Sequence, residues 1–168
     1  MNIRVGLLIA VTALVGSLAQ ADERAYVELG LVPMKFSAGG GSLTPDVAVV
    51  RLGYEFTKNF ATEVTAATTV KSDGAGGVDF KVDKAWGAYL KGNVKVAQDF
   101  ELFAKLGYVR TQLSVSSLGS ASDNSLSYAV GAQYHFSKTL YGQLDYASYY
   151  NKDGLSGTGP SISVGVRF

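Results

Sequence analysis

From Arg24 onwards, apolar and polar residues alternate along the chain with a period of two. This period is typical of β-strands that have one apolar and one polar face. Turn residues separate eight such segments, and the predicted strands are 24–36, 46–56, 60–70, 79–94, 100–115, 125–136, 140–150 and 161–168. No long amphipathic helix pattern competes with any of them. The sequence therefore predicts an all-β fold.

The connections between these strands are of two kinds, and the two kinds alternate. Short polar turns fall at 57–59, 97–99 and 137–139, which are 40 residues apart. Longer glycine- and serine-rich loops are predicted at 37–45, 71–78, 116–124 and 151–160. Each repeat holds only two strands, which favours a hairpin unit over a propeller blade or a solenoid repeat. A meander with short turns at one end and longer loops at the other is typical of a transmembrane barrel.

The two faces of the predicted sheet differ in polarity. One face is aliphatic and aromatic, and it includes Leu29, Leu52, Val64, Trp86, Leu106, Tyr128, Leu144 and Val164. The other face carries Glu28, Arg51, Glu55, Glu63, Lys91, Glu101, Lys105, Gln133, His135, Gln143, Asp145 and Arg167. Periodicity alone does not show which face is inside. A soluble calycin-like ligand-binding barrel would turn the apolar face inwards, whereas a membrane barrel would turn it outwards to lipid.

Three observations favour the membrane barrel. The charged face includes Gly30, Gly53, Gly87, Gly107, Gly131 and Gly165, and an eight-stranded barrel has little interior room for larger side chains. Aromatic residues cluster beside the short turns, where an interfacial girdle belongs. The last strand ends on the apolar-face residue Phe168. We therefore expect an eight-stranded antiparallel up-and-down transmembrane β-barrel, with strands of about 10 residues that are long enough to cross a bilayer.

The first residues have the pattern of a secretory signal. Arg4 precedes the apolar run 5–18, and Ala19-Gln20-Ala21 has the small-x-small pattern of a signal-peptidase site. The apolar run is shorter than the roughly 20 residues that a membrane helix needs, which disfavours a retained span. We expect residues 1–21 to be cleaved and residues 22–168 to form one barrel domain.

The composition excludes several classes of function. The 168 residues include no cysteine, and 15 Lys and Arg stand against 14 Asp and Glu. The chain can therefore form no disulfide, thiolate zinc site or thiol nucleophile. A nearly neutral charge without a basic run does not fit a nucleic-acid partner. The glycine-rich loops lack the dinucleotide and P-loop spacings, and the aspartates are too scattered for a calcium loop. We expect no cofactor and no metal.

The charged face is the first candidate site. Nine ionisable residues are predicted to face the lumen: Glu28, Arg51, Glu55, Glu63, Lys91, Glu101, Lys105, Asp145 and Arg167. Four are basic and five acidic, so the interior is nearly self-neutralising, and such groups are costly to bury unless they are paired. Two interpretations are open. The charges form either a salt-bridged plug without a continuous pore or a narrow water path for small solutes.

The segment His135-Phe136-Ser137 is a second candidate, because it holds the only histidine of the chain. A serine hydrolase needs its serine and histidine within hydrogen-bond reach and an acid to orient the imidazole. The spacing resembles the His-x-Ser motif of outer-membrane lipid A deacylases, and eight-stranded barrels also include a lipid A palmitoyltransferase. Here the motif lies at a short turn, far from the outer leaflet that holds lipid A. A non-catalytic protein is the expectation and a lipid A-modifying enzyme the alternative.

The whole pattern resembles the small eight-stranded outer-membrane barrels of the OmpA/OmpX type, with a porin-like β-barrel domain. The resemblance covers the mature chain and is carried by the runs 53–56, 104–108 and 132–136 and by the terminal Val166-Arg167-Phe168. It implies a Gram-negative outer-membrane protein in which Val166 and Phe168 form part of the signal read by the insertion machinery. The expected role is outer-membrane integrity, surface interaction or limited small-solute passage.

The expected partners are lipids, and the protein is expected to be a monomer. Outer-membrane lipid and lipopolysaccharide would surround the barrel. Four lysines of the predicted loop end are candidates for contact with lipopolysaccharide phosphates: Lys71, Lys81, Lys84 and Lys152. Exposed lysines usually only interact with solvent. The sequence therefore leaves open whether these lysines contact lipopolysaccharide or water.

Overall fold

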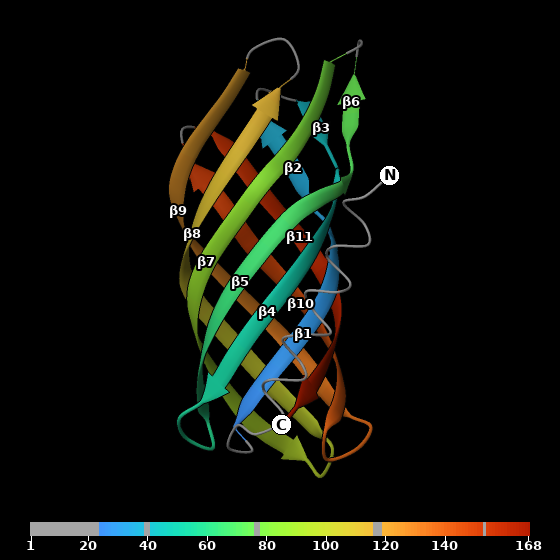
Figure 1. Cartoon of the computed structure of the whole chain (residues 1–168), viewed down its shortest axis with the longest axis vertical. Helices are drawn as coiled ribbons and strands as arrows, with labels where there is room; N and C mark the ends of the chain where they lie inside the picture. Colours follow the sequence, from blue (N-terminus) through green and yellow to red (C-terminus); the bar gives the residue numbers. More distant parts are fainter. Residues whose placement is uncertain (1–23, 39–40, 76–77, 116–118, 153) are drawn as a thin grey trace.

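The computed structural model describes residues 24–38, 41–75, 78–115, 119–152 and 154–168. They form one antiparallel sheet that closes on itself into a tall cylinder (Figure 1). Among these residues there is no helix with the length and apolar character needed to cross a bilayer. The expected signal segment, residues 1–21, lies outside the described part of the chain.

Eight long strands form the barrel wall, and three of them are interrupted once. The bounds are β1 Ala25–Pro33, β2 Lys35–Ala38, β3 Gly41–Leu43, β4 Asp46–Glu55, β5 Phe60–Lys71, β6 Asp73–Ala75, β7 Val78–Ala97, β8 Phe100–Val115, β9 Gly119–His135, β10 Leu140–Lys152 and β11 Leu155–Arg167. β1 continues into β2, β3 into β4, and β5 into β6. β1 pairs with both β4 and β11, which closes the barrel. Closure pairs the backbone groups that a bilayer interior would otherwise leave unsatisfied.

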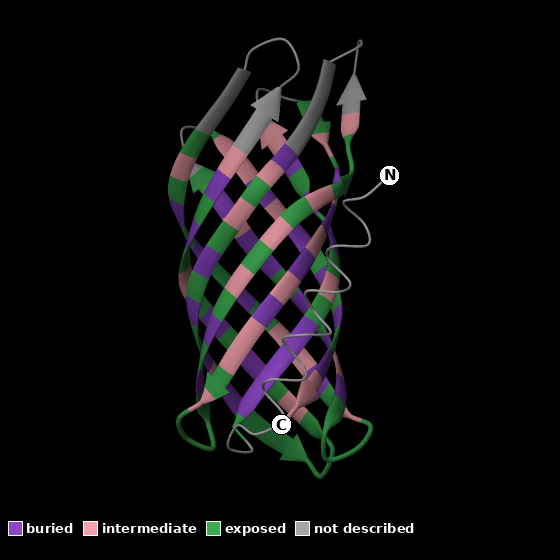
Figure 2. Ribbon diagram, viewed as in Figure 1, coloured by how far each residue is buried: buried purple, intermediate pink, exposed green. Residues whose placement is uncertain are grey.

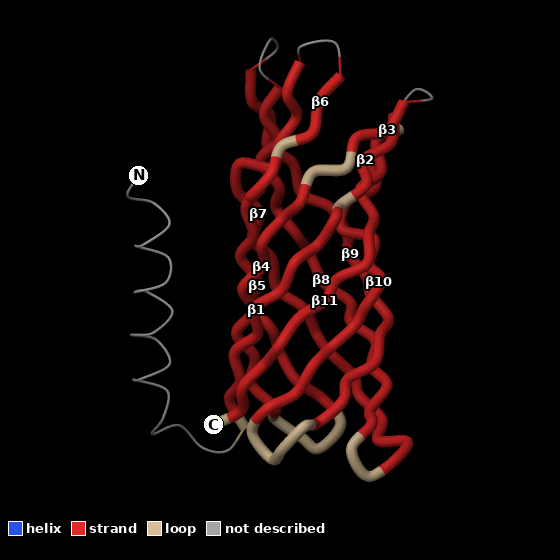
Figure 3. The backbone as a smooth tube through the Cα atoms, turned by 90° about the vertical axis from the view of Figure 1, so that its right-hand side faces the viewer, coloured by secondary structure: helices blue, strands red, loops and turns tan. Residues whose placement is uncertain are grey.

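The observed strands agree with the predicted ones at the short-turn end and extend further at the opposite end. β9 begins at Gly119 and β11 at Leu155, so residues 119–124 and 155–160 are strand rather than loop. These segments are rich in Ser, Thr and Gly and lack the apolar alternation that marks a strand in a sequence. Interstrand hydrogen bonds hold them as strands all the same. Figure 3 shows these extensions at the end opposite the short turns, and we call this end the extension end.

Exposed and buried residues alternate along the wall strands (Figure 2). On the outer face, Trp86, Leu106 and Tyr128 are 60%, 56% and 54% exposed. On the inner face, Glu28 and Glu63 are 0% and 1% exposed. This distribution is the reverse of that in a soluble protein, and an apolar surface of this extent fits lipid rather than water. The structure confirms the membrane barrel over the calycin-like alternative.

Two of the short turns are built in the same way. Between β4 and β5, the Thr57 hydroxyl accepts hydrogen bonds from the N–H groups two and three residues further on, at 3.2 and 3.0 Å. Between β9 and β10, the Ser137 hydroxyl accepts the equivalent bonds at 3.2 and 3.0 Å. A hydroxyl in this position satisfies N–H groups of the tight turn. The turns fix the register of the strands that they join, and thereby the level at which each lumen residue lies.

Candidate functional site: the charged lumen

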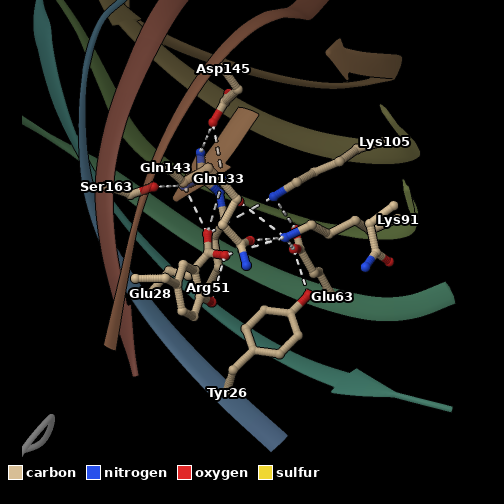
Figure 4. A network of polar contacts seen from close by, with 12 residues as sticks. Tyr26, Glu28, Arg51, Glu63, Lys91, Lys105, Gln133, Gln143, Asp145 and Ser163 are labelled. Atoms are coloured by element: carbon tan, nitrogen blue, oxygen red, sulfur yellow. Dashed lines mark hydrogen bonds and ion pairs between the residues drawn. The ribbon is translucent and has the colours of Figure 1, made fainter. Parts of the chain in front are cut away.

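Charged side chains from six strands meet in the lumen (Figure 4). We call them the central ion cluster: Glu28 of β1, Arg51 of β4, Glu63 of β5, Lys91 of β7, Lys105 of β8 and Asp145 of β10. None of the six side chains is more than 5% exposed. Three carboxylates stand against three cations, so the formal charges of the cluster cancel.

Strand register explains one half of this cluster. Lys91 and Lys105 lie directly opposite each other on β7 and β8, and like charges in such a pair repel. Glu63 offsets the repulsion because its two oxygens bind one lysine each. Lys105 Nζ lies 2.7 Å from Glu63 Oε2, and Lys91 Nζ lies 3.5 Å from Glu63 Oε1. The carboxylate therefore bridges the two cations.

Arg51 organises the other half. It lies directly across from Glu28 on the neighbouring strand, and its Nη1 is 3.4 Å from Glu28 Oε2. Its Nη2 lies 3.8 Å from Asp145 Oδ1 and donates to Ser161 Oγ at 3.1 Å. The halves are joined because Lys91 Nζ also lies 3.6 Å from Glu28 Oε1. One connected network thus crosses the lumen.

Neutral side chains donate further hydrogen bonds to the same carboxylate oxygens. The Tyr26 hydroxyl donates to Glu63 Oε1 at 2.7 Å, and the Tyr141 hydroxyl donates to Glu28 Oε1 at 2.9 Å. Gln143 Nε2 donates to Glu28 Oε2 at 3.3 Å. Buried ion pairs are tolerated when such hydrogen bonds complete them. Neither tyrosine belongs to the predicted lumen set, although the alternation that places Glu28 and Gln143 inside also places the tyrosines there.

Four of the aromatic rings in the lumen lie over a glycine directly opposite on a neighbouring strand, along the part of the wall nearer the short turns. The pairs are Tyr26 with Gly53, Tyr89 with Gly107, Phe103 with Gly131, and Tyr141 with Gly165. A β-carbon on any of these glycines would overlap the facing ring. The sequence pattern predicts that lumen glycines relieve crowding, and the structure shows that inward-facing aromatic rings are what they accommodate.

A smaller polar group lies in the lumen near the short turns. Arg167 Nη2 is 2.9 Å from Glu55 Oε1 and 3.8 Å from Glu101 Oε2, and His135 Nε2 is 3.2 Å from Glu101 Oε1. These side chains are 12–21% exposed, more than those of the central ion cluster. The nine predicted lumen charges thus divide into a buried set of six and a more hydrated set of three.

One side of the lumen near the extension end is apolar, which the sequence pattern did not predict. A buried cluster here, which we call the apolar cap, consists of Val32, Met34, Phe36, Val47, Val49 and Val82. The adjoining cavity measures about 30 Å³, room for no more than a few water molecules. At this level the outer face carries exposed polar residues such as Lys35 and Lys84. Strand polarity is therefore inverted relative to the middle of the barrel, as expected where the wall leaves lipid and meets water.

The His135-Phe136-Ser137 segment is divided between the lumen and a turn. His135 lies beside Glu101 and 3.1 Å from Gln133 Nε2. Ser137 is exposed, and its hydroxyl accepts the two N–H groups of the turn. The hydrogen bonds of these two side chains within the described residues do not join them to each other.

Comparison with known protein families establishes the family. Residues 5–168 match the outer membrane protein beta-barrel domain. The chain belongs to this family. The predicted likeness to small outer-membrane barrels is thereby confirmed, and the apolar outer surface of this outer membrane protein beta-barrel is its lipid-facing surface.

Several solved structures share the fold of this outer-membrane barrel. Neisserial surface protein A has 18% identity and a TM-score of 0.71, over 86% of this chain and 97% of that chain. Ail, the attachment invasion locus protein of Yersinia pestis, has 18% identity and a TM-score of 0.66, over 86% and 98% of the two chains. The N-terminal β-barrel domain of OprF from Pseudomonas aeruginosa has 11% identity and a TM-score of 0.60, over 85% and 97%. No curated protein sequence matches the chain significantly.

Proposed function

We propose that this protein is a non-conducting, non-catalytic barrel of the outer membrane. Its role is to contribute to membrane integrity and to present its strand extensions at the cell surface, without passing solutes. The observation that supports this role is the central ion cluster, which joins side chains from opposite walls at mid-lumen. It favours the salt-bridged plug over the water path.

The contacts of the cluster are direct. The 2.7 Å separation of Lys105 Nζ and Glu63 Oε2 leaves no space for water between them. A permeating ion would have to separate such pairs, and an unpaired buried charge costs several kcal/mol. The interior of an eight-stranded barrel is just wide enough for side chains, and the inward rings of Tyr26, Phe103 and Tyr141 occupy much of it. The lumen therefore acts as a packed core.

The apolar cap adds a second barrier. An apolar constriction disfavours hydrated ions because water does not wet it well. Val32 and Val47 are both 0% exposed in this layer. Ions would thus pass along this apolar wall before they reached the central charges.

The arrangement around Ser137 supports a non-catalytic role. A nucleophilic serine needs a base within hydrogen-bond reach, whereas the Ser137 hydroxyl is engaged by the turn and His135 by Glu101. Incubation of the purified protein with lipid A should release no fatty acid and transfer none. Release or transfer that Ser137→Ala abolishes would contradict this part of the proposal.

The C-terminal strand supports a proposed contact with the insertion machinery. Val166 lies opposite both Val27 and Leu140, and the Phe168 N–H donates to the Ala25 carbonyl at 2.9 Å. The end of the chain therefore closes the barrel, and its edge is free for another strand or partner until closure. Deletion of Phe168 should lower the amount of assembled protein in outer membranes, and unchanged assembly would count against this contact.

Solute uptake by vesicles tests the closed lumen. Vesicles that contain the purified protein should swell in isotonic sugar or amino-acid solutions at the rate of protein-free vesicles. Insertion is verified separately by the heat-dependent gel mobility of the folded barrel, and a general porin serves as the positive control. Faster swelling than in protein-free vesicles would overturn the closed lumen.

A further inference from the structure

Two basic residues lie side by side on the outer face of the barrel near the extension end. Lys84 of β7 is directly opposite Gln112 of β8, and Trp86 is directly opposite Arg110. Lys84, Trp86 and Arg110 are all exposed. Lys84 and Arg110 are therefore diagonal neighbours on one face, a relation that places their Cα atoms about 7–8 Å apart. Two long cationic side chains at this distance reach a common ligand.

Aromatic residues place this pair at the boundary of the membrane. On each strand an aromatic residue lies two positions nearer the short turns than the cation: Trp86 beside Lys84 on β7, and Tyr108 beside Arg110 on β8. The two aromatic side chains are 60% and 63% exposed. Trp and Tyr prefer the membrane interface. Beyond Lys84 the inner face becomes apolar at Val82, part of the apolar cap. The two cations therefore lie at the level of lipid headgroups, just beyond the apolar band.

The topology indicates which leaflet this is. β7 and β8 are joined at residues 98–99 by a short turn, and short turns of outer-membrane barrels face the periplasm. Lys84 and Arg110 lie at the opposite end of these two strands. Their level is that of the external leaflet.

The cations of this pair have no acidic partner among the described residues. Within the described part of the chain, neither Lys84 nor Arg110 takes part in a salt bridge. The outer-face neighbours towards β5 and β9 are the uncharged Thr68 and Asn124. By contrast, Lys71 faces Asp46 across β4 and β5, and the side chains of Lys81 and Lys152 lie outside the described residues. Of the four lysines considered from sequence, Lys84 is the one that the structure places in an unneutralised cationic pair.

We infer that Lys84 and Arg110 bind a phosphate of a phosphorylated glycolipid of the external leaflet, of the lipid A type. The guanidinium can donate two parallel hydrogen bonds to the phosphate, and the ammonium adds a point charge. Trp86 and Tyr108 contact the lipid below its headgroup. The inference requires membrane insertion and does not depend on the closed lumen, so a conducting barrel would leave it intact.

The single tryptophan of the chain reports on this site directly. Trp86 lies opposite Arg110 and is the only Trp in the sequence. The protein is reconstituted in phosphatidylcholine vesicles with increasing amounts of bisphosphorylated lipid A, or of the same lipid with its phosphates removed. Trp86 fluorescence should change saturably with the phosphorylated lipid alone. Lys84→Gln should weaken the apparent affinity about tenfold, since it removes one charge-assisted interaction with the phosphate, and Arg110→Gln should weaken it by at least as much, since it removes a bidentate pair.

Matched variants separate a specific site from general attraction. Arg110→Lys keeps the positive charge but loses the planar guanidinium that donates two parallel hydrogen bonds, and should give an intermediate affinity. Lys138→Gln removes an exposed lysine at the short-turn end and should bind like the unmodified protein. Because these side chains lie outside the lumen, the variants should insert normally, which gel mobility verifies. If one of the two glutamine variants fails to insert, the affinity of the other is compared with that of the unmodified protein.

Four results would overturn the inference. They are equal responses to the phosphorylated and dephosphorylated lipids, unchanged affinity in both glutamine variants, equal weakening by Lys138→Gln, and a saturable response to inorganic phosphate alone. The last of these would indicate a site for free anions in place of a lipid site.

Discussion

The ring of Tyr26 lies over Gly53, the residue directly opposite it on the neighbouring strand. A β-carbon at position 53 would lie too close to Tyr26 Cζ and overlap that ring. The ring position allows the Tyr26 hydroxyl to donate to Glu63 at 2.7 Å. A glycine on the barrel wall thus positions a hydrogen bond of the central ion cluster.

Gly53→Ala should destabilise the barrel by about 1–3 kcal/mol, the usual cost of overpacking a core. Gly92→Ala is the matched control, because a β-carbon there would meet the Phe60 ring at an ordinary 3.4 Å. In a Tyr26→Ala background, Gly53→Ala should lower the free energy of unfolding only slightly, since the ring that the methyl group would meet is absent. Urea unfolding in vesicles measures the parent and the four variants, and equal costs for Gly53→Ala and Gly92→Ala would contradict the account.

Lys105→Met should destabilise the barrel by about 3–5 kcal/mol, because it leaves Glu63 and Glu28 with too little positive charge in a buried site. The double variant Lys105→Met/Glu63→Gln should recover part of the loss, since it restores the balance of charge. Lys138→Gln, on the exposed turn, should unfold like the parent protein. If the two lumen substitutions were simply additive in unfolding experiments, the coupling described between these side chains would be wrong.

Thr57→Ala and Ser137→Ala should have similar and modest effects. Each removes a hydroxyl that accepts two backbone N–H groups in a short turn, at a cost of about 0.5–1.5 kcal/mol per substitution. Neither variant should differ from the parent in a lipid A deacylation assay. A clear difference in stability between the two variants would show that Ser137 has a role that Thr57 lacks.

The fold could be predicted because the bilayer imposes a strict pattern on the wall. Residues such as Trp86 and Leu106 must be apolar where lipid surrounds the strand, while the inward positions between them are polar. This alternation is readable residue by residue, and the short turns mark its interruptions. Strand number, order and orientation therefore followed from the sequence.

The contacts within the lumen could not be predicted, because they depend on register across the barrel. Glu63 and Lys105 are 42 residues apart, and nothing local shows that they share a level whereas Glu55 lies nearer the short turns. The apolar cap was missed for a related reason. Val32 and Val82 face inwards although they are apolar, because the polarity of the strands inverts where they leave the membrane.

Planar-bilayer conductance of the purified protein tests the central claim most directly. With insertion verified by gel mobility, the account predicts no discrete current steps above those of the bare bilayer, since the central ion cluster and the apolar cap close the lumen. Reproducible single-channel steps from the inserted protein would contradict it and would identify the lumen charges as the lining of a water path.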